Sequence, residues 1–456
     1  CAAAEERVFR AGAATSNITP LIGDLVVGGF DPQPSKHIHD ELHARCLVLD
    51  DGATRIAMVV CDNLSLAREV CDEAKELASK ATGIPTNRIL ISATHTHSGV
   101  SGRSQRLLTP DPQLSTYQQF LVRRIADGLV RAVNNLEPAR IGWGVGAEPD
   151  QVFNRRWYMK PGPDLANPFG GVDQVRMNPP AKSPNLIEPA GPTDPQVSFL
   201  SVQSRDGRPI ALLANYSLHY VGGTTGSAIS ADYFAVFADR IQQMLGADRL
   251  DPPFVGMMSN GTSGDVNNNN VLHPHPKQPP YGRMRIVANA VAAEVYRVHQ
   301  SIEFHDWVPL GMTERELTVA SRKPTPEMVA RAKRLVAGEQ KPDHARDLAY
   351  ANRTLDMETA PPEVTMVLQA IRIGDLGIAT SPFETFTETG LEIKQRSPWK
   401  PTFTIELANG AYGYLPTPEQ HRLGGYETWL GTNRVEINAS RKMTDALVNM
   451  LEELKD

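Results

Sequence analysis

The chain of 456 residues lacks the features that assign many proteins to a class at once. No apolar run approaches the roughly 18 residues that a membrane-spanning helix needs. There is no block rich in Lys and Arg, and 46 basic against 52 acidic residues give a net charge of −6, which argues against nucleic acid as a partner. The motifs Gly-x-Ser-x-Gly, His-Glu-x-x-His, Walker A and the dinucleotide fingerprint are all missing. Any catalytic site must therefore be sought in another pattern.

Cysteine is scarce, with four residues and no Cys-x-x-Cys pair. Cys46 and Cys61 lie in strand-like apolar runs and Cys71 lies on an expected helix, so buried free thiols are the first interpretation. A bridge between Cys46 and Cys61 stays open if those two strands pair. Cys1, followed by Ala-Ala-Ala-Glu-Glu, resembles the mature end of a bacterial lipoprotein, and a cloning boundary explains it equally well.

The first interpretation of Cys1 predicts a lipid anchor there and a periplasmic or secreted protein, held at the membrane as a lipoprotein. Under either interpretation residues 1–10 are expected to form an N-terminal tether. The rest of the chain alternates between apolar strand patterns and helical patterns, and it shows no internal repeat and no clean linker. This alternation predicts an α/β fold with a mixed β-sheet core flanked by helices.

Local patterns place several elements. Apolar runs at 44–50 and 55–62 predict neighbouring strands joined at Asp51-Gly52. Helical spacing and capping residues predict further helices; these begin after Ser65 and Ser230 and span 115–136, 283–300, 326–337 and 440–454. Residues 150–196 are rich in Pro, Gly and Asn and predict a long connection, of the kind that serves as a lid or a binding loop.

The most informative stretch is 88–99, an apolar strand that ends in His95 and His97 and then in Ser-Gly. Alternation on an extended backbone points both imidazoles to one side, and ligands of α/β sheets gather beyond the carboxyl ends of strands. An isolated His-x-His is more often a pair of loop histidines without a metal. Two other such pairs occur. For His39 and its neighbour at 37, a place at the same cleft and a place on the surface are equally expected, and the pair at 273 and 275 is expected on the surface.

Three further strands end in potential ligands, and this favours a metal site over a pair of loop histidines. His219 follows the strand at 208–218, Glu384 follows the one at 375–383, and Tyr414 follows the one at 402–411. Two histidines and a carboxylate with room for water are typical of a catalytic zinc site. The sequence therefore predicts a metal site at the C-terminal ends of the strands.

Taken together, these motifs resemble the neutral (non-lysosomal) ceramidase family. The resemblance covers nearly the whole chain and is carried, in order, by Thr-His-Thr-His-Ser-Gly at 94–99, Asp-Pro-Gln-Val-Ser at 194–198, Asn-Tyr-Ser-Leu-His at 215–219, Ser-Ala-Asp at 230–232, Gly-Asp-Val at 264–266 and Pro-Phe-Glu at 382–384. It implies that residues 11–456 form a single catalytic domain. It also implies a zinc-dependent hydrolase, in which zinc-activated water attacks an amide (N-acyl) bond.

The resemblance implies roles for individual residues as well. The zinc ligands would be His95, His219, Glu384 and Tyr414. His97 would contact the substrate, while Arg155 and Tyr426 resemble the family's active-site arginine and late tyrosine. These three are the candidate catalytic residues, as donors to the charge that develops on the substrate.

Two departures from the family pattern concern the substrate. Characterised members continue into an additional C-terminal β-domain, whereas this sequence ends at Asp456. The segment that places an active-site serine is two residues longer here, which leaves Ser259 and Ser263 as alternative candidates for substrate contact, together with His39. We expect a small-molecule or lipid-like substrate, smaller or more polar than long-chain ceramide. Two alternatives stay open: the same zinc site acting on another amide, ester or glycan-derived substrate, and a surface lipoprotein that binds a ligand without turnover.

Overall fold

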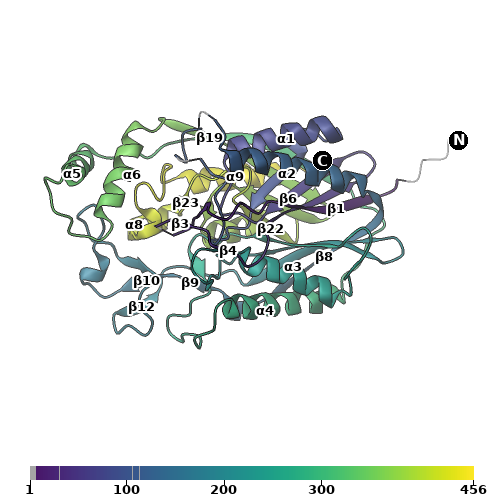
Figure 1. Cartoon of the computed structure of the whole chain (residues 1–456), viewed down its shortest axis with the longest axis horizontal. Coiled ribbons are helices and arrows are strands. Elements are labelled where there is room, and N and C mark those ends of the chain that lie inside the picture. The colour runs from purple at the N-terminus through teal and green to yellow at the C-terminus, as the bar shows by residue number, and fades with distance from the viewer. Residues whose placement is uncertain (1–6, 30, 105, 112, 456) are drawn as a thin grey trace.

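The computed structural model describes residues 7–29, 31–104, 106–111 and 113–455. Its centre is a mixed sheet of eight strands, with a parallel pair at each edge and antiparallel pairs between them (Figure 1). In spatial order the strands are β16 (Val255–Asn260), β14 (Pro209–Tyr216), β13 (Gln196–Ser204), β8 (Glu137–Ala147), β1 (Arg10–Asn17), β5 (His43–Asp50), β6 (Arg55–Cys61) and β7 (Ile89–Ala93).

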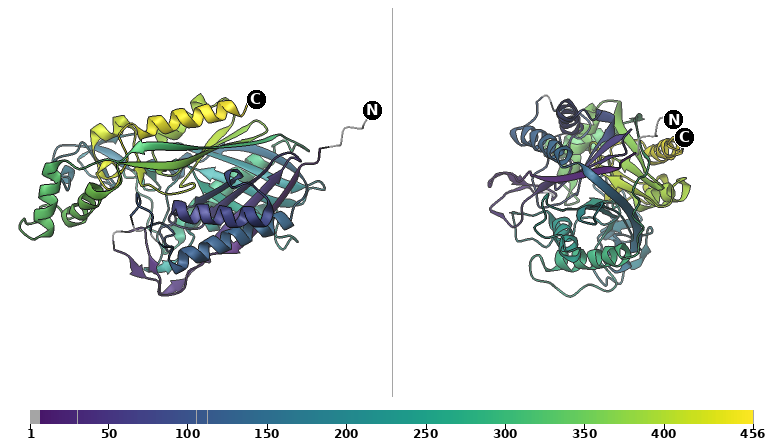
Figure 2. Two further views of the ribbon diagram at one scale, coloured as in Figure 1. Left: turned by 90° about the horizontal axis from the view of Figure 1, so that it is seen from above. Right: turned by 90° about the vertical axis from the view of Figure 1, so that its right-hand side faces the viewer.

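Helices cover one face of this sheet and a second sheet covers the other, as the two views of Figure 2 show. In β5, Ala44, Cys46 and Val48 face the helices while Leu47 and Leu49 face the second sheet, and all five are fully buried. A strand buried on both faces has a continuous apolar sequence, which is the pattern seen here. The covering helices are α1 (Arg68–Thr82), α2 (Thr116–Asn134), α3 (Asp232–Met244) and α4 (Gly282–His299).

The second sheet has four strands, and two helices pack on its outer face to complete four layers. Its strands, in order, are β18 (Leu310–Ala320), β19 (Glu363–Ile373), β20 (Leu376–Ser381) and β22 (Thr402–Glu406), and the outer helices are α7 (Thr387–Arg396) and α9 (Ala439–Glu453). The remaining elements are β2 (Leu25–Val26), β3 (Gln33–Pro34), β4 (His37–Ile38), β9 (Phe153–Asn154), β10 (Arg156–Met159), β11 (Val175–Met177), β12 (Leu186–Pro189), β15 (Ala228–Ile229), β17 (Val266–Asn267), β21 (Glu384–Thr385), β23 (Tyr414–Leu415), α5 (Pro326–Val336), α6 (Asp347–Thr359) and α8 (Pro418–Leu423).

The predicted α/β class with a mixed sheet and flanking helices is confirmed. The predicted hairpin of β5 and β6 is also confirmed, but its register places Cys46 opposite Val59 and Cys61 opposite Ala44. The two sulfurs are therefore not joined, and Cys46, Cys61 and Cys71 are buried free thiols.

Two predicted helix starts were too early, one by two residues and the other by one. Helix α1 begins at Arg68 with Ala67 as its N-cap, and α3 begins at Asp232 with Ala231 as its N-cap. The Ser230 hydroxyl accepts a hydrogen bond from the Asp232 N–H at 3.1 Å, yet it also donates to Asp40 at 2.7 Å. Tertiary contacts thus compete with local capping at this serine.

Residues 150–196 are more structured than the predicted connection. They contain β9 and a small sheet in the order β11, β10, β12, because Trp157 and Met159 bury their side chains against Leu165 and Val271. This small sheet and the α5–α6 pair lie at the same end of the molecule (Figure 1).

The N-terminal part of the chain begins the fold earlier than predicted. Phe9 is fully buried and Arg10 pairs with Asp50, so residues 7–10 belong to the folded body. The predicted lipid anchor at Cys1 falls in residues 1–6, outside the described residues. Within the part of the chain that is described, no helix is both long and apolar enough to cross a membrane.

Candidate metal centre

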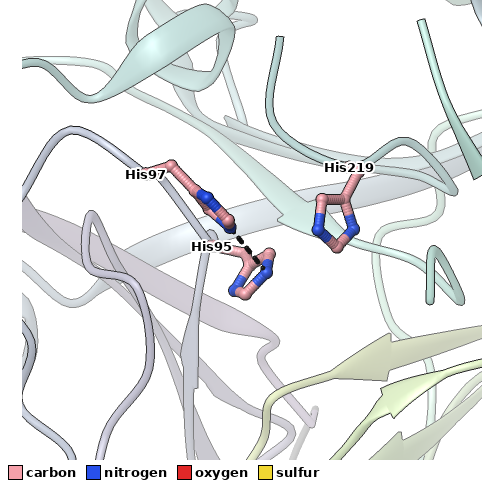
Figure 3. Close-up of side chains that lie close together, drawn as sticks. All are labelled: His95, His97 and His219. Atoms are coloured by element: carbon pink, nitrogen blue, oxygen red, sulfur yellow. Dashed lines mark hydrogen bonds between the residues drawn. The ribbon is translucent and has the colours of Figure 1, made fainter. Parts of the chain in front are cut away.

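Three histidines from two strand ends converge on one point. His95 and His97 follow β7 and His219 follows β14, and their nearest ring nitrogens all lie within 4.8 Å of one another (Figure 3). His95 has a positive φ of 74°, which is uncommon for a residue with a side chain and is sustained here by the surrounding contacts. The group is able to hold a metal ion.

The hydrogen bonds of His95 and His219 fix the free nitrogen of each ring. His95 Nδ1 donates to the Leu64 carbonyl at 2.8 Å, and His219 Nδ1 donates to the Ser263 carbonyl at 3.1 Å. Because a neutral imidazole has one donor and one acceptor nitrogen, both Nε2 atoms present lone pairs to the shared space. Carbonyl partners of this kind orient metal-binding histidines in many proteins.

Glu384 faces the same space. Its Oε2 lies 3.3 Å from His95 Nε2 and 3.8 Å from His219 Nε2. Both His219 Nε2 and Glu384 Oε2 are buried without a hydrogen-bond partner among the described residues. Unpartnered buried polar atoms are rare, and two that face one another fit a bound cation. A tetrahedral zinc with bonds of 2.0–2.1 Å separates its ligands by about 3.3 Å, which agrees with these spacings.

Tyr414 completes a set of four. Parallel pairing of β21 with β23 places it directly beside Glu384, and its hydroxyl accepts a hydrogen bond from Arg155 Nη2 at 3.1 Å. Burial raises the pKa of Tyr414 well above its ordinary value, against the opposing effect of the Arg155 guanidinium. Burial also acts to raise the pKa of Glu384, but His95, Tyr414 and Arg155 outweigh it and hold that pKa below its usual range.

His97 differs from the other two histidines because, among the described residues, no backbone carbonyl accepts from its ring. Its Nε2 lies 3.1 Å from His95 Nε2; because His95 has its proton on Nδ1, its Nε2 lone pair can accept from His97 or bind a metal, but not both at once. Its ring stacks on Tyr220 with centroids 3.7 Å apart. Burial, and then the neighbouring positive groups, lower the pKa of His97 well below its ordinary value, so the ring is neutral at pH 7.

A cavity of about 130 Å³ opens onto this centre, and its wall includes His95, His97, Glu384, Tyr414 and Tyr426. Five predicted site residues, which come from separate parts of the sequence, are thus brought together at one cavity. Larger cavities lie elsewhere: one of about 610 Å³ beside the loop at 268–280 and one of about 400 Å³ beside α1, and neither is lined by a predicted ligand.

Arg155 lies one layer behind this cavity, not in its wall. Its Nε donates to Glu427 at 2.9 Å, and its Nη2 donates to the Gly264 carbonyl at 2.8 Å as well as to Tyr414. Glu427 also accepts from Arg156 at 2.7 Å, and all of these groups are buried. In this arrangement Arg155 holds Tyr414 in place.

The two candidate serines occupy different environments. The Ser259 hydroxyl donates to the Ala214 carbonyl at 3.1 Å and accepts from Asn215 at 3.0 Å, within the sheet and away from the cavity wall. The Ser263 hydroxyl lies behind the metal-facing ring, 3.3 Å from His219 Nδ1. His39, the other candidate for substrate contact, stacks on Tyr281 with centroids 3.6 Å apart and is not part of the cavity wall.

Glu406 is a residue of this site that the sequence analysis missed. It is fully buried and accepts three hydrogen bonds, from Ser263 Oγ at 2.6 Å, Ser263 N at 3.2 Å and Thr385 N at 2.8 Å. It thereby connects through Ser263 to His219 and stands beside the strand that carries Glu384. A carboxylate inside the apolar run of β22 was the available signal, because such a group is buried only where partners satisfy it.

Asp232 belongs to the Ser-Ala-Asp motif at 230–232, for which the sequence analysis predicted no role. Its carboxylate accepts from the Val221 and Gly222 N–H groups at 3.1 and 2.7 Å, and so fixes the loop that follows His219. Burial raises the pKa of Asp232 to about 6, although these N–H groups oppose the rise.

Comparisons with known proteins identify the family of the chain. Residues 9–278 match the family model described as neutral/alkaline non-lysosomal ceramidase, N-terminal. The chain is 24% identical over 236 residues to the neutral ceramidase of Pseudomonas aeruginosa, covering 50% of this chain and 32% of that protein. It is 24% identical over 273 residues to neutral ceramidase B of Dictyostelium discoideum, covering 57% of this chain and 36% of that protein. The matched part thus spans about a third of the length of each curated relative.

The fold is also similar to solved structures. The crystal structure of the neutral ceramidase from Pseudomonas aeruginosa superposes with a TM-score of 0.73 at 19% identity, covering 99% of this chain and 75% of that one. A structure of a ceramidase complexed with C2 gives a TM-score of 0.72 at 18% identity, covering 99% and 76%. At this level of identity the likeness concerns the fold.

Proposed function

The chain belongs to the neutral/alkaline non-lysosomal ceramidase family, and on this premise we propose that it is a zinc-dependent hydrolase that cleaves an amide (N-acyl) bond. The observation that supports this most is the pair of atoms without a hydrogen-bond partner among the described residues, His219 Nε2 and Glu384 Oε2, which face one another beside His95 Nε2. Glu384 and His95 also line the cavity. That arrangement has the donor types and the spacing of a catalytic zinc site.

The proposed ligands are His95, His219, Glu384 and Tyr414. His97 is left out because its ring is stacked on Tyr220 and no backbone carbonyl of the described residues orients it, and once His95 Nε2 binds the metal the His97 Nε2 proton is free for another acceptor. Bound zinc would supply a water molecule with a pKa of about 7 and would polarise the amide carbonyl. Glu406, Ser263 and Asp232 hold the segments that carry the ligands.

Two other residues of the cavity wall are placed to donate hydrogen bonds to the substrate. His97 is neutral, carries a proton on Nε2 and lines the cavity, so it is placed to donate to the substrate or to the leaving amine. Tyr426 lines the same cavity, and its hydroxyl is the second candidate donor to the charge on the carbonyl oxygen. Arg155 acts on Tyr414 and so positions a ligand.

The size of the cavity favours a compact substrate. Its volume of about 130 Å³ is below the roughly 300–1,000 Å³ of sites that enclose drug-sized ligands. The space holds the atoms around one amide group, and a long acyl chain would have to lie outside it. We therefore propose that short or polar N-acyl compounds are better substrates than long-chain ceramide.

The proposal is tested by metal analysis of the purified protein combined with a hydrolysis screen over N-acyl sphingoid bases and short N-acyl amines. We expect one zinc per chain, loss of amide hydrolysis on chelation and its return when zinc is added. A protein that is fully loaded with zinc but hydrolyses none of these amides would contradict the catalytic role. Hydrolysis that survives complete removal of the metal would contradict the zinc mechanism.

A further inference from the structure

Two arginines are part of the wall of the metal-site cavity. Arg103 and Arg353 line the cavity together with Glu384, which is the one carboxylate among the described residues of its wall. Glu384 is a proposed zinc ligand, so its charge is directed to the metal. A ceramide, which has no charge, offers no anionic group to these arginines.

A third arginine lies directly behind the wall. Gly413 is part of the wall and has a φ of +96°, and a Cβ built on it would lie 2.6 Å from Arg434 Nη1. The guanidinium of Arg434 thus occupies the space that a side chain at 413 would fill. Glycine at this position is what allows Arg434 to approach the cavity so closely.

Thr432 joins this cluster to the metal site. Its hydroxyl accepts from Arg353 Nη1 at 3.3 Å, and its carbonyl accepts from Arg434 Nη1 at 3.1 Å. The same carbonyl accepts the backbone N–H of Tyr414 at 3.2 Å. Arg353 and Arg434 are therefore held at fixed positions relative to a proposed zinc ligand, whereas Arg103 is an exposed residue of the cavity wall without such a contact.

The positive charges act on one another. Burial first, and then the charges of Arg353 and Arg103, lower the pKa of Arg434 to about 10. The pKa of Arg103 is also lowered, by loss of solvation and by Arg353, although Glu384 opposes this. Among the described residues the Arg103 guanidinium makes no hydrogen bond or ion pair. The guanidinium groups of Arg103 and Arg434 remain charged at pH 7 and would be stabilised by an anion.

Resting on the proposed amide hydrolysis, we propose that the substrate carries an anionic group, a carboxylate or a phosphate, close to the scissile amide, and that Arg103 and Arg353 bind it. A guanidinium fork matches the oxygens of either group, and such charge-assisted bonds are stronger than neutral ones. The cluster also disfavours a leaving group that becomes a simple cation, as a sphingoid amine does, since like charges repel.

The test uses the zinc-loaded protein and probes that differ only in charge. N-hexanoylglycine and N-hexanoylglycinamide have the same shape, with and without a carboxylate, and N-hexanoyl-O-phosphoethanolamine presents a phosphate in place of the carboxylate. Values of kcat and KM are measured for the wild type, Arg103→Gln and Arg353→Gln. Arg106→Gln is the matched control, because Arg106 lies on the same loop, is exposed, sits 3.8 Å from Asp356 and is not part of the cavity wall.

We expect the wild type to prefer an anionic probe over the neutral amide, mainly through KM. Each of the two cavity variants should reduce that preference roughly tenfold, the scale of one lost hydrogen bond to a charged group. Arg106→Gln should keep it, and Arg103→Lys should restore part of it. The better of the carboxylate and phosphate probes identifies the anionic group. Circular dichroism and zinc content confirm that each variant is folded and loaded.

The outcomes separate this proposal from the proposed function. Equal kcat/KM for the anionic and neutral probes, or a preference that Arg103→Gln and Arg353→Gln leave intact, overturns the arginine subsite while amide hydrolysis stands. If the zinc-loaded protein hydrolyses no probe, the proposed function fails, and calorimetric binding of the same probes decides the subsite. Tighter binding of an anionic probe that is lost in Arg103→Gln and kept in Arg106→Gln supports it. Equal binding overturns it.

Discussion

The substitution Ser263→Ala tests whether this serine supports the metal site or attacks the substrate. The Ser263 hydroxyl donates to Glu406 at 2.6 Å and lies 3.3 Å from His219 Nδ1, on the side of the ring that faces away from the cavity. The substitution removes both contacts and adds no bulk. His219 keeps its bond to the Ser263 carbonyl at 3.1 Å, and Glu406 keeps two backbone N–H donors.

The magnitude follows from what is lost and what remains. Removing the outer partner of a metal-binding histidine costs about 10- to 100-fold in metal affinity. Because the carbonyl contact survives, we expect the lower end of that range, about tenfold weaker zinc binding. The lost bond to a buried carboxyl should reduce the free energy of unfolding by about 1.5–3 kcal/mol.

The assay is a zinc titration against a competing chelator, combined with activity measured at saturating zinc. Ser259→Ala is the matched control, because Ser259 is also fully buried and makes two hydrogen bonds, but these lie within the sheet. We expect the control to lose about 1–2 kcal/mol of stability with unchanged zinc affinity. Ser263→Ala should recover most of its activity once zinc is saturating.

One result would refute this reasoning. If Ser263→Ala bound zinc as tightly as the wild type and were nevertheless inactive at saturating zinc, the hydroxyl would act on the substrate directly. The contact with His219 would then be incidental to its function.

Three further expectations concern the metal, the pH dependence and the substrate. His219→Ala should lose zinc and activity together, and full zinc occupancy by elemental analysis would contradict the ligand assignment. Burial raises the pKa of Asp265 from 3.8 to about 6, so its contribution to stability is complete below pH 3.8 and is lost as the pH rises through 6. Urea denaturation should therefore show that the free energy of unfolding of the wild type falls by about 2.5 kcal/mol relative to Asp265→Asn between pH 4 and 7.5, whereas a constant difference would show an unshifted carboxyl. Among N-acyl sphingoid bases, kcat/KM should fall as the acyl chain lengthens, and efficient turnover of a long-chain ceramide in detergent would contradict the compact cavity.

Features carried by one continuous segment could be predicted from the sequence. The apolar runs that end in His95, His219 and Glu384 were visible because each strand and its polar end are adjacent in the chain. Their order, with the flanking motifs, predicted the family, which the match over residues 9–278 confirms. The mixed sheet followed from the alternation of strand and helix patterns.

Features that depend on distant partners could not be predicted. Ser263 and Glu406 are 143 residues apart, and nothing near either one shows that they form a hydrogen bond. Arg353 comes from α6, which was not predicted, and its position depends on a contact with Thr432. Nor did any local pattern indicate that Arg155 lies behind Tyr414, since its partners are separated by 259 and 272 residues.

The ligand set is tested most directly by a crystal structure of the zinc-loaded protein, with anomalous diffraction recorded at the zinc edge. We expect a single zinc peak bound by His95 Nε2, His219 Nε2, a Glu384 oxygen and the Tyr414 hydroxyl, with His97 beside the metal but not bound to it. A zinc ion held instead by His95, His97 and His219, with Glu384 and Tyr414 turned away, would contradict the account.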